Sequence, residues 1–439
     1  MSRKNQNTVA IVTMILLFGM ISFVTNLAAP VGNIWKHQPG IEGSNALGIM
    51  GNMMNFLAYL FMGIPAGRIL NRLGSKKTIL IAISVGFSGV FIQFLSGIVG
   101  VGVSISDIPA NYFVYLAGAF VSGFSVCMLN TVVNPMLTLL GGEKRGNQYI
   151  QMGGTCNSLM GPITPILVGS LIGQITKDTF ISDVNPVLYI AMGVFAAAFI
   201  ILSFIPLSDP EEIIADTEGV TSPLKFRHFV LGAAAIFMYV GVEVGIPGTL
   251  NFFLSDVSEK GGRLDPRTAT AIAGFVEGTY WFMMFIGRLI GSVISGKVSS
   301  RAQLTAVTLI AMALVACAIF TPVSSRISMP VFTGSGSGFA MAKVPVSALL
   351  LVCCGLCTCV MWGSIFDLAV RGLGKSTVLA SGIFMTMVVG GGILPLAQNI
   401  LADATSYMTS YWVVIAGLAF INWYAVKGSR PVISQHKDR

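Results

Sequence analysis

The chain has 439 residues, of which 54% are hydrophobic and only 10% are charged, and its mean hydropathy is +0.80. A soluble domain carries about 25% charged residues, so these few charges cannot cover the surface of a water-soluble protein of this length. The composition therefore predicts a polytopic membrane protein and excludes a soluble one.

Twelve stretches are long and apolar enough to cross a bilayer, for which a helix needs about 20 mostly apolar residues. Strands of a membrane barrel would be about 10 residues long with strict alternation, so the stretches favour helices. The expected fold is all-α, with twelve transmembrane helices. The stretches are residues 8–30, 46–69, 78–103, 112–140, 149–173, 187–206, 228–254, 269–296, 303–322, 344–367, 377–401 and 410–426.

The distribution of basic residues predicts the orientation of these helices. Of the 26 lysines and arginines, eighteen lie in the tails and loops on the side of the termini, seven lie on the opposite side, and Arg288 lies inside a span. Because basic residues accumulate on the cytoplasmic side, both termini are expected in the cytoplasm. This topology explains the net charge of +8. A nucleic-acid-binding role is not expected, because the basic residues do not cluster in a folded domain.

The longest cytoplasmic connection divides the chain into two halves. We expect an N-terminal six-helix half at residues 1–207, a polar cytoplasmic linker at 208–227, and a C-terminal six-helix half with a short tail at 228–439. Two such halves are typical of secondary transporters with internal repeats. The loops are too short for a nucleotide-binding domain and contain no P-loop, so ATP is not the expected energy source.

No enzymatic centre is expected. Four cysteines crowd one stretch, but in an apolar run cysteine behaves as a small hydrophobe, and no histidine lies near them. Neither a metal site, a cofactor nor an activated nucleophile is predicted. These cysteines are Cys353, Cys354, Cys357 and Cys359.

The connection between the second and third stretches reads Gly-Arg-Ile-Leu-Asn-Arg-Leu-Gly-Ser-Lys-Lys over residues 67–77. Glycines allow a tight turn, and the basic residues hold it at the cytoplasmic face. The spacing resembles the signature loop of the major facilitator superfamily, although that signature has an acid where Asn71 stands. The resemblance implies that this loop is a conformational latch, with Gly67, Arg68, Arg72, Gly74, Lys76 and Lys77 as its residues.

Residues 130–135 read Asn-Thr-Val-Val-Asn-Pro inside an otherwise apolar stretch. Two amides and a helix-breaking proline are costly in hydrocarbon unless they face protein or a water-filled path. The segment therefore predicts a polar cavity within the membrane, and hence transport.

Seven motifs in order resemble the fucose permease family of sugar–proton symporters, which includes glucose/galactose carriers. They are Phe23-Val-Thr-Asn-Leu, Thr131-Val-Val-Asn-Pro, Asn157-Ser-Leu-Met-Gly, Tyr239-Val-Gly-Val-Glu-Val, Gly287-Arg-Leu-Ile-Gly, Gly372-Leu-Gly-Lys and Gly390-Gly-Gly-Ile-Leu-Pro, the last followed by Leu401-Ala-Asp. The resemblance implies a facilitator fold, a bacterial inner membrane and a monosaccharide substrate.

Two positions depart from that family. The resemblance places an aspartate where this chain has Ala29 and a glutamate where it has Asn130, and it links those acids to proton coupling and sugar binding. A neutral amide hydrogen-bonds a hydroxyl but carries no proton at physiological pH. Proton coupling is therefore not carried over, whereas Asn157 matches the family's amide near the sugar.

Sugar recognition uses amides for the hydroxyls and aromatic faces for the C–H surface of the ring. The substrate-binding candidates are Asn26, Asn130, Asn134, Gln151, Asn157, Tyr280, Trp281 and Trp362. Trp281 and Trp362 fit equally well as packed or lipid-facing aromatics.

Intramembrane acids are functional candidates, so Glu243, Glu277 and Asp367 are the candidate proton-coupling residues. For two of them, a purely structural role is the alternative. Asp367 is four residues before Arg371 and fits a simple helical ion pair, and Glu243 fits a structural role at a motif position.

The sequence thus predicts a monomeric transporter that moves a small solute, a monosaccharide such as fucose, glucose or galactose, by alternating access with H⁺ or Na⁺ coupling. An uncoupled facilitator, a carrier of a non-sugar solute and a non-transporting membrane sensor are the alternatives.

Overall fold

The structure is a computed structural model that describes residues 3–172, 179–205, 222–294, 298–332, 339–373 and 377–430. Twelve helices in these ranges are long and apolar enough to span a membrane, which confirms the all-α fold and the predicted number of spans. The spans are Asn7–Trp35, Met50–Leu70, Arg72–Leu95, Ala110–Asn134, Met152–Ile172, Ile181–Phe204, Arg227–Ser255, Ala269–Gly291, Ser300–Phe320, Val346–Val370, Gly382–Ala404 and Tyr407–Gly428.

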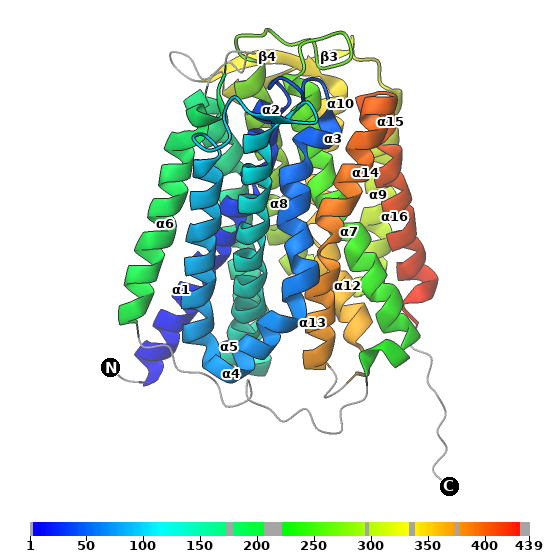
Figure 1. Ribbon diagram of the computed structural model, residues 1–439. Helices are drawn as coiled ribbons and strands as arrows, with labels where there is room; N and C mark the ends of the chain where they lie inside the picture. The colour runs from blue at the N-terminus through cyan, green and yellow to red at the C-terminus, as the bar shows by residue number, and fades with distance from the viewer. Residues whose placement is uncertain are drawn as a thin grey trace.

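These spans are built from helices that run side by side in one bundle (Figure 1). The first six spans comprise α1 (Arg3–Thr25), α2 (Ala28–Trp35), α3 (Asn45–Gly48), α4 (Met50–Leu95), α5 (Ala110–Ile172) and α6 (Asn185–Phe204). The last six comprise α7 (Arg227–Ser255), α8 (Ala269–Ile294), α9 (Ser300–Phe320), α10 (Val346–Cys353), α11 (Gly355–Thr358), α12 (Met361–Val370), α13 (Thr377–Met387), α14 (Gly390–Ala404), α15 (Tyr407–Ser410) and α16 (Trp412–Trp423).

The described residues also form two short antiparallel hairpins. β1 (Ser104–Ile105) pairs with β2 (Ile108–Pro109), and β3 (Arg326–Phe332) pairs with β4 (Phe339–Pro345). β3 and β4 lie at one end of the bundle, which we call the hairpin end, and both chain termini lie at the other (Figure 1). Neither hairpin was predicted from the sequence.

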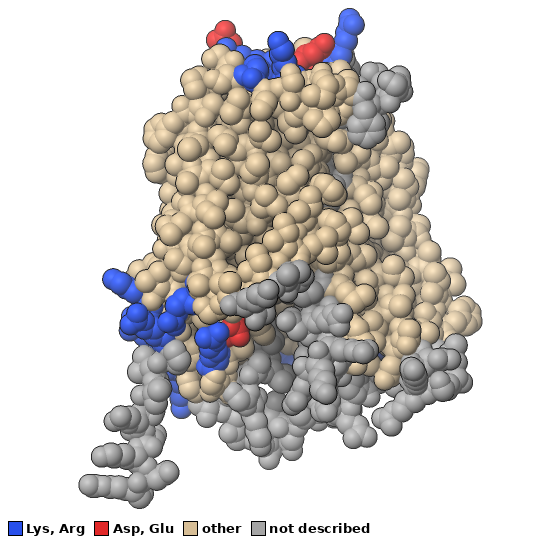
Figure 2. Space-filling model, turned by 180° about the vertical axis from the view of Figure 1, so that it is seen from behind, with Lys and Arg blue, Asp and Glu red and all other residues tan. Residues whose placement is uncertain are grey.

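The surface between the two ends is apolar. On the face drawn in Figure 2, the Lys, Arg, Asp and Glu side chains gather near the two ends, and an uncharged band separates them. Large apolar side chains such as Leu16, Phe61 and Ile201 are more than half exposed. In a soluble protein this much exposed apolar surface would drive association, whereas here it matches the hydrocarbon core of a bilayer.

The helices that border the two halves are interrupted at several points. The first span breaks at Asn26 and Leu27, between α1 and α2, and Ile49 separates α3 from the second span, which begins at Met50 in α4. Pro247 interrupts the hydrogen-bonding ladder inside α7, because proline has no N–H to donate. Irregular backbone at membrane depth is stable only where it is buried in protein or lines a cavity. These breaks therefore indicate where a site can lie.

Contacts between the first six and the last six spans follow two seams. In one, α5 packs against α8, and in the other α4 packs against α13 and α14. α5 and α8 can approach this closely because residue 161 is a glycine: a Cβ added at Gly161 would lie 2.9 Å from Cγ of Trp281. The predicted linker at 208–227 falls largely on residues 206–221, which lie outside the described ranges.

Candidate functional site

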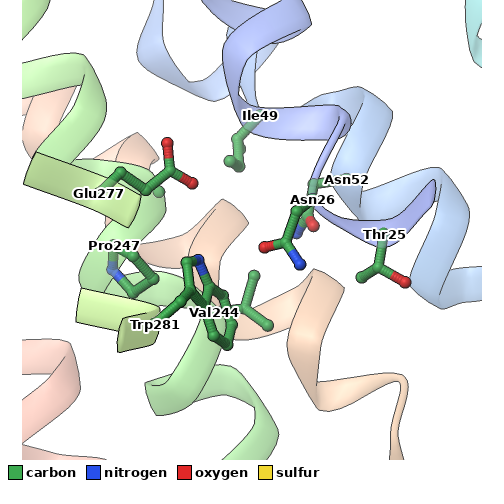
Figure 3. A pocket seen from close by; sticks show the side chains of 9 residues that line it. Thr25, Asn26, Ile49, Asn52, Val244, Pro247, Glu277 and Trp281 are labelled. Carbon is green, nitrogen blue, oxygen red and sulfur yellow. The ribbon is translucent and has the colours of Figure 1, made fainter. Parts of the chain in front are cut away.

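A small cavity lies where the interrupted helices meet. It has a volume of about 20 Å³ and is bordered by Thr25, Asn26, Ile49, Asn52, Val244, Pro247, Gly248, Glu277 and Trp281 (Figure 3). Its wall comes from both the first and the last six spans. This volume holds about one water molecule, so a monosaccharide does not fit in the arrangement described here. The structure therefore has this part of the path closed.

Two amides of the first six spans are fixed in the cavity wall. Asn26 donates from Nδ2 to the backbone oxygen of Ser22 at 2.9 Å and to its Oγ at 3.2 Å. The side-chain oxygen of Asn26 is on the side of Glu277 and Trp281 (Figure 3). Asn52 donates from Nδ2 to the backbone oxygen of Gly391 at 2.8 Å, across the seam between α4 and α14. Both amides thus keep a side-chain oxygen that can accept from a solute hydroxyl.

Among the described residues that border this cavity, Glu277 is the only carboxylic acid. It lies on α8, is 2% exposed, and accepts a hydrogen bond at 2.8 Å from Nδ2 of Asn251 on α7. Asn251 in turn accepts from Nδ2 of Asn33 on α2 at 3.5 Å. Within the described part of the chain, no Lys, Arg or His forms an ion pair with Glu277. The acid is therefore buried with one amide donor and no counterion.

Trp281 borders the same cavity with an unpaired donor. Its indole Nε1 is buried and has no acceptor among the described residues. Tyr280 supports the ring from behind, since the two ring centroids are 5.4 Å apart and nearly perpendicular, and the Tyr280 hydroxyl is held by Thr358 at 3.0 Å. A buried donor without a partner costs about 1–3 kcal/mol. A hydroxyl in the cavity would accept from Trp281 and donate to Glu277 or Asn26.

A second polar cluster involves Arg288, farther along α8. Tyr239 donates to Oε1 of Glu243 at 2.6 Å, and Nη2 of Arg288 lies 3.9 Å from the same oxygen. Nη1 of Arg288 donates to the backbone oxygen of Gly154 on α5 at 2.5 Å. Glu243 thus has both a cation and a hydroxyl donor, and Arg288 links the last six spans to the first six.

The amides singled out in the fourth and fifth spans do not border the cavity. Asn130 donates to the hydroxyl of Tyr59 at 2.9 Å, and Asn134 donates to the backbone oxygen of Asn130 at the same distance. Asn157 donates to the backbone oxygen of Phe18 at 3.1 Å. In this closed arrangement Asn130 links α5 to α4 and Asn157 links α5 to α1, whereas the Asn134 bond stays within α5. The role of these amides toward a solute stays a prediction.

The remaining predicted residues lie in different surroundings. Trp362 packs against Tyr239, with ring centroids 6.2 Å apart. Asp367 is half exposed, pairs with Arg371 at 2.6 Å and accepts from Ser300 at 2.6 Å, which matches its structural alternative. The side chain of Gln151 lies outside the described residues.

The signature loop at residues 67–77 forms a sharp corner in α4. Gly74 has φ +78° and ψ 170°, a conformation that favours glycine. Lys76 donates from Nζ to the backbone oxygen of Ser203 at the end of α6 at 3.0 Å, whereas Arg68, Arg72 and Lys77 are exposed. The latch role of this loop remains a prediction.

A polar cluster that sequence reasoning missed joins the spans at the hairpin end. Lys36, which follows α2, donates from Nζ to the hydroxyl of Tyr407 at 3.1 Å and lies 4.5 Å from the ring centre of Phe252. The Tyr407 hydroxyl is 3.0 Å from Oδ1 of Asn45 and 3.1 Å from Oδ2 of Asp256, and its hydrogen can serve one of them. Burial lowers the pKa of Lys36 to about 8, partly opposed by Asp256 and Asp403.

Asp403 completes this cluster. Its Oδ1 accepts from the backbone N–H of Asn45 at 2.7 Å, and its Oδ2 accepts from the N–H of Ala46 at 2.9 Å and from Oγ of Ser44 at 3.0 Å. All three donors belong to the first turn of α3, where a negative charge is favourable. We call the set Lys36, Ser44, Asn45, Ala46, Asp256, Asp403 and Tyr407 the hairpin-end clasp.

Comparisons with known proteins agree with this architecture. The family model described as Major Facilitator Superfamily matches residues 9–395. A glucose/galactose transporter of Brucella abortus is 27% identical over 438 residues, which cover 98% of this chain and 96% of the relative. The L-fucose-proton symporter of Escherichia coli is 25% identical over 375 residues, covering 80% of this chain and 77% of the symporter.

Solved structures show the same fold. The transporter FucP in its outward conformation has a TM-score of 0.65 and 20% identity, with coverage of 95% of this chain and 98% of that chain. A bacterial homologue of the human lysosomal transporter Spinster, in an inward-facing and occupied conformation, has a TM-score of 0.62 and 12% identity, with coverage of 95% of both chains.

Proposed function

Because the chain belongs to the Major Facilitator Superfamily, we propose that it carries a monosaccharide across a bacterial inner membrane by alternating access. The observation that carries this proposal is the closed cavity between the two sets of six spans, where Asn26, Glu277 and Trp281 meet. The relatives named as glucose/galactose transporter and L-fucose-proton symporter support a sugar as the solute.

The two sets of six spans would move as two halves, residues 1–207 and 228–439, around the linker at 208–227. The seams between α5 and α8 and between α4 and α14 would hold the halves together while each end opens in turn. The excess of basic residues in the tails and loops on the terminal side supports a cytoplasmic position for both termini and an outward position for the hairpin end. The functional unit would be a monomer.

The solute would bind by its hydroxyls. A sugar hydroxyl at the cavity can accept from the unpaired Nε1 of Trp281 and donate to the side-chain oxygen of Asn26 or to Glu277. When the halves separate, the cavity would widen, and Asn130, Asn157 and Trp362 would extend the polar wall along the path. The solute-binding role of Asn134, Gln151 and Tyr280 belongs to the same proposal, with Tyr280 holding the ring of Trp281 in place.

Transport would be coupled to an ion gradient. The relative named as an L-fucose-proton symporter supports a proton as the coupling ion. The signature loop at residues 67–77 would act as a latch between conformations, because the corner at Gly74 and the contact of Lys76 with α6 place it at the terminal end of two spans.

Counterflow tests this function. The purified chain is reconstituted in liposomes loaded with unlabelled fucose, glucose or galactose, and a trace of the labelled sugar is added outside. Entry of label above its external concentration, absent from protein-free liposomes, is the expected result. Failure of every hexose, deoxyhexose and amino sugar to enter, while the protein keeps its thermal unfolding transition, would contradict sugar transport.

A further inference from the structure

We propose that Glu277 is the group that carries the coupled proton, and that Asn251 and Asn33 connect it to the closure of the hairpin end. This inference rests on the proposed transport function and goes beyond it by assigning the coupling site to one side chain.

The three candidate acids differ in what balances their charge. Glu243 has the Arg288 guanidinium 3.9 Å away and a hydroxyl donor at 2.6 Å. Asp367 is half exposed and has Arg371 at 2.6 Å. Glu277 is 2% exposed and has one neutral donor, Asn251. An ionised carboxylate that is buried without a cation is strongly disfavoured, whereas the neutral acid is not. Glu277 therefore fits the closed arrangement as the protonated acid.

The described residues packed around Glu277 offer no positive charge that would balance its carboxylate. On α8 itself, Tyr280 is engaged by Thr358. On α7, the charged side chain nearest in sequence to Asn251 is Glu243, which is paired with Arg288. The clasp groups Lys36 and Asp256 face each other and Tyr407 at the hairpin end. Among the described residues of α5, α10 and α11, none forms an ion pair with Glu277. A proton is thus the simplest neutralising ion.

Glu277 is connected to the closure between the halves by two amides. Asn251 bridges Glu277 on α8 and Asn33 on α2, with distances of 2.8 Å and 3.5 Å. The backbone oxygen of Asn33 also accepts from the ring of His37 at 2.8 Å, and His37 adjoins Lys36 of the clasp. Separation of α2 from α7 would break the bridge between the amides and admit water to Glu277.

This arrangement links the movement of the proton to the movement of the solute. When the hairpin end opens, water reaches Glu277 and exchanges protons with it. When the end closes around the solute, the acid is buried again in its neutral form, and its O–H can donate to a solute hydroxyl. The solute thus favours closure of the protonated carrier over closure of the empty one, so the proton moves with the solute. Opening at the terminal end returns Glu277 to water, where it releases the proton. Asn251 and Asn33 are positioning residues in this scheme, because they act through Glu277.

The test separates exchange from coupling in proteoliposomes. Counterflow at equal pH measures exchange alone. Accumulation driven by a pH gradient of one unit, acid outside and with the membrane potential clamped, measures coupling, and one proton per sugar supports about tenfold accumulation. We expect wild type to show both activities. Because Glu277 also borders the solute site, Glu277→Gln should show counterflow with a raised half-saturating sugar concentration, and at saturating sugar it should exchange label but fail to accumulate it. Asp367→Asn is the matched control and should show both.

Each result of these assays either supports or overturns the role of Glu277. Accumulation by Glu277→Gln under the pH gradient, or wild-type accumulation driven by Na⁺ alone, overturns the inference but leaves sugar transport intact. Absence of wild-type counterflow overturns the transport function itself. If Glu277→Gln also loses counterflow, proton uptake on sugar addition is measured in weakly buffered detergent solution. Sugar binding without proton uptake supports the inference, and binding with wild-type proton uptake overturns it.

Discussion

The carboxylate of Asp403 accepts a hydrogen bond from the backbone N–H of Asn45 at 2.7 Å, although 357 residues separate the two in the sequence. It also accepts from Ala46 and Ser44 in the same turn of α3. One side chain of the last six spans thus holds the start of the second span. Any separation of the halves at the hairpin end must break these bonds, so Asp403 controls the stability of the closed end.

Asp403→Asn should shift the protein toward the outward-open arrangement. An amide has one oxygen in place of the two carboxylate oxygens and lacks the charge. Hydrogen bonds to a charged group contribute about 1.5–3 kcal/mol, so we expect the open fraction to rise about tenfold. Spin labels at Val101 and Glu259, in a background without reactive cysteines, report the distance by double electron–electron resonance. An unchanged distance distribution would contradict the role of Asp403.

Closure of the hairpin-end clasp should also depend on pH, through the protonation of Lys36. Its pKa is about 8 when the end is closed and should approach the ordinary value of 10.5 when the end is open. The closed form therefore binds fewer protons than the open form between these values. Closure becomes more favourable as the pH rises above about 8. At lower pH both forms hold the proton, so this lysine gives closure no pH dependence.

The same spin-label distance, followed from pH 7 to 9.5, tests this direction. The closed population should grow with pH in wild type and stay constant in Lys36→Met. His37, Tyr407, Asp256 and Asp403 face Lys36, so equal pH dependence in the variant would assign the effect to one of these groups and contradict the prediction.

Trp281→Phe should weaken solute binding without disturbing the packing of α8 on α5. The phenyl ring keeps the apolar contact but has no Nε1 to donate, and a hydrogen bond contributes about 0.5–1.5 kcal/mol. The half-saturating sugar concentration in counterflow should rise up to about tenfold. Trp412→Phe, which alters an exposed aromatic packed on Phe320 outside the cavity, is the control and should leave this concentration unchanged.

Gly161→Val should block transport. A Cβ at this position would lie 2.9 Å from Cγ of Trp281, so a larger side chain displaces the ring or separates α5 from α8. A Cβ at Gly193 on α6 would meet nothing within 4 Å, which makes Gly193→Val the matched control. Counterflow should be lost in the first variant and kept in the second. Equal activity of the two would show that this close approach is dispensable.

Glu243→Met should destabilise the protein, because it leaves Arg288 without its carboxylate. Removal of one member of a fully buried pair costs about 3–5 kcal/mol, whereas replacing both by apolar residues is often neutral. This pair is about 15% exposed with its atoms 3.9 Å apart, so the cost should lie below that range. The double variant Glu243→Met with Arg288→Met should therefore recover much of the lost thermal stability in detergent. A double variant that unfolds at the temperature of the single one would argue against this pairing.

The sequence was sufficient to predict the twelve spans, because the length of an apolar run is set by the thickness of the bilayer. It also identified Asn26, Glu277 and Trp281, since polar and acidic groups stand out in such runs. It did not reveal that these three share one cavity while Asn130 is engaged by Tyr59. Which helix faces meet depends on packing between distant spans, and no local pattern records that packing.

The clasp and the two hairpins were missed for related reasons. Lys36 resembles an ordinary basic residue at a span end, and its burial depends on Phe252 and Tyr407 from the other half. Asp403 stood in a recognised motif, but its partners lie in α3. The strands β3 and β4 contain Pro330 and Pro345, which weaken the usual strand signal.

Proton-coupled sugar transport is tested most directly by the accumulation of labelled sugar by the reconstituted chain under an inward proton gradient. We expect concentrative uptake of at least one of fucose, glucose and galactose, which an uncoupler abolishes and which collapses to equilibration in Glu277→Gln. Uptake of no monosaccharide, under this gradient or in counterflow, would contradict sugar transport.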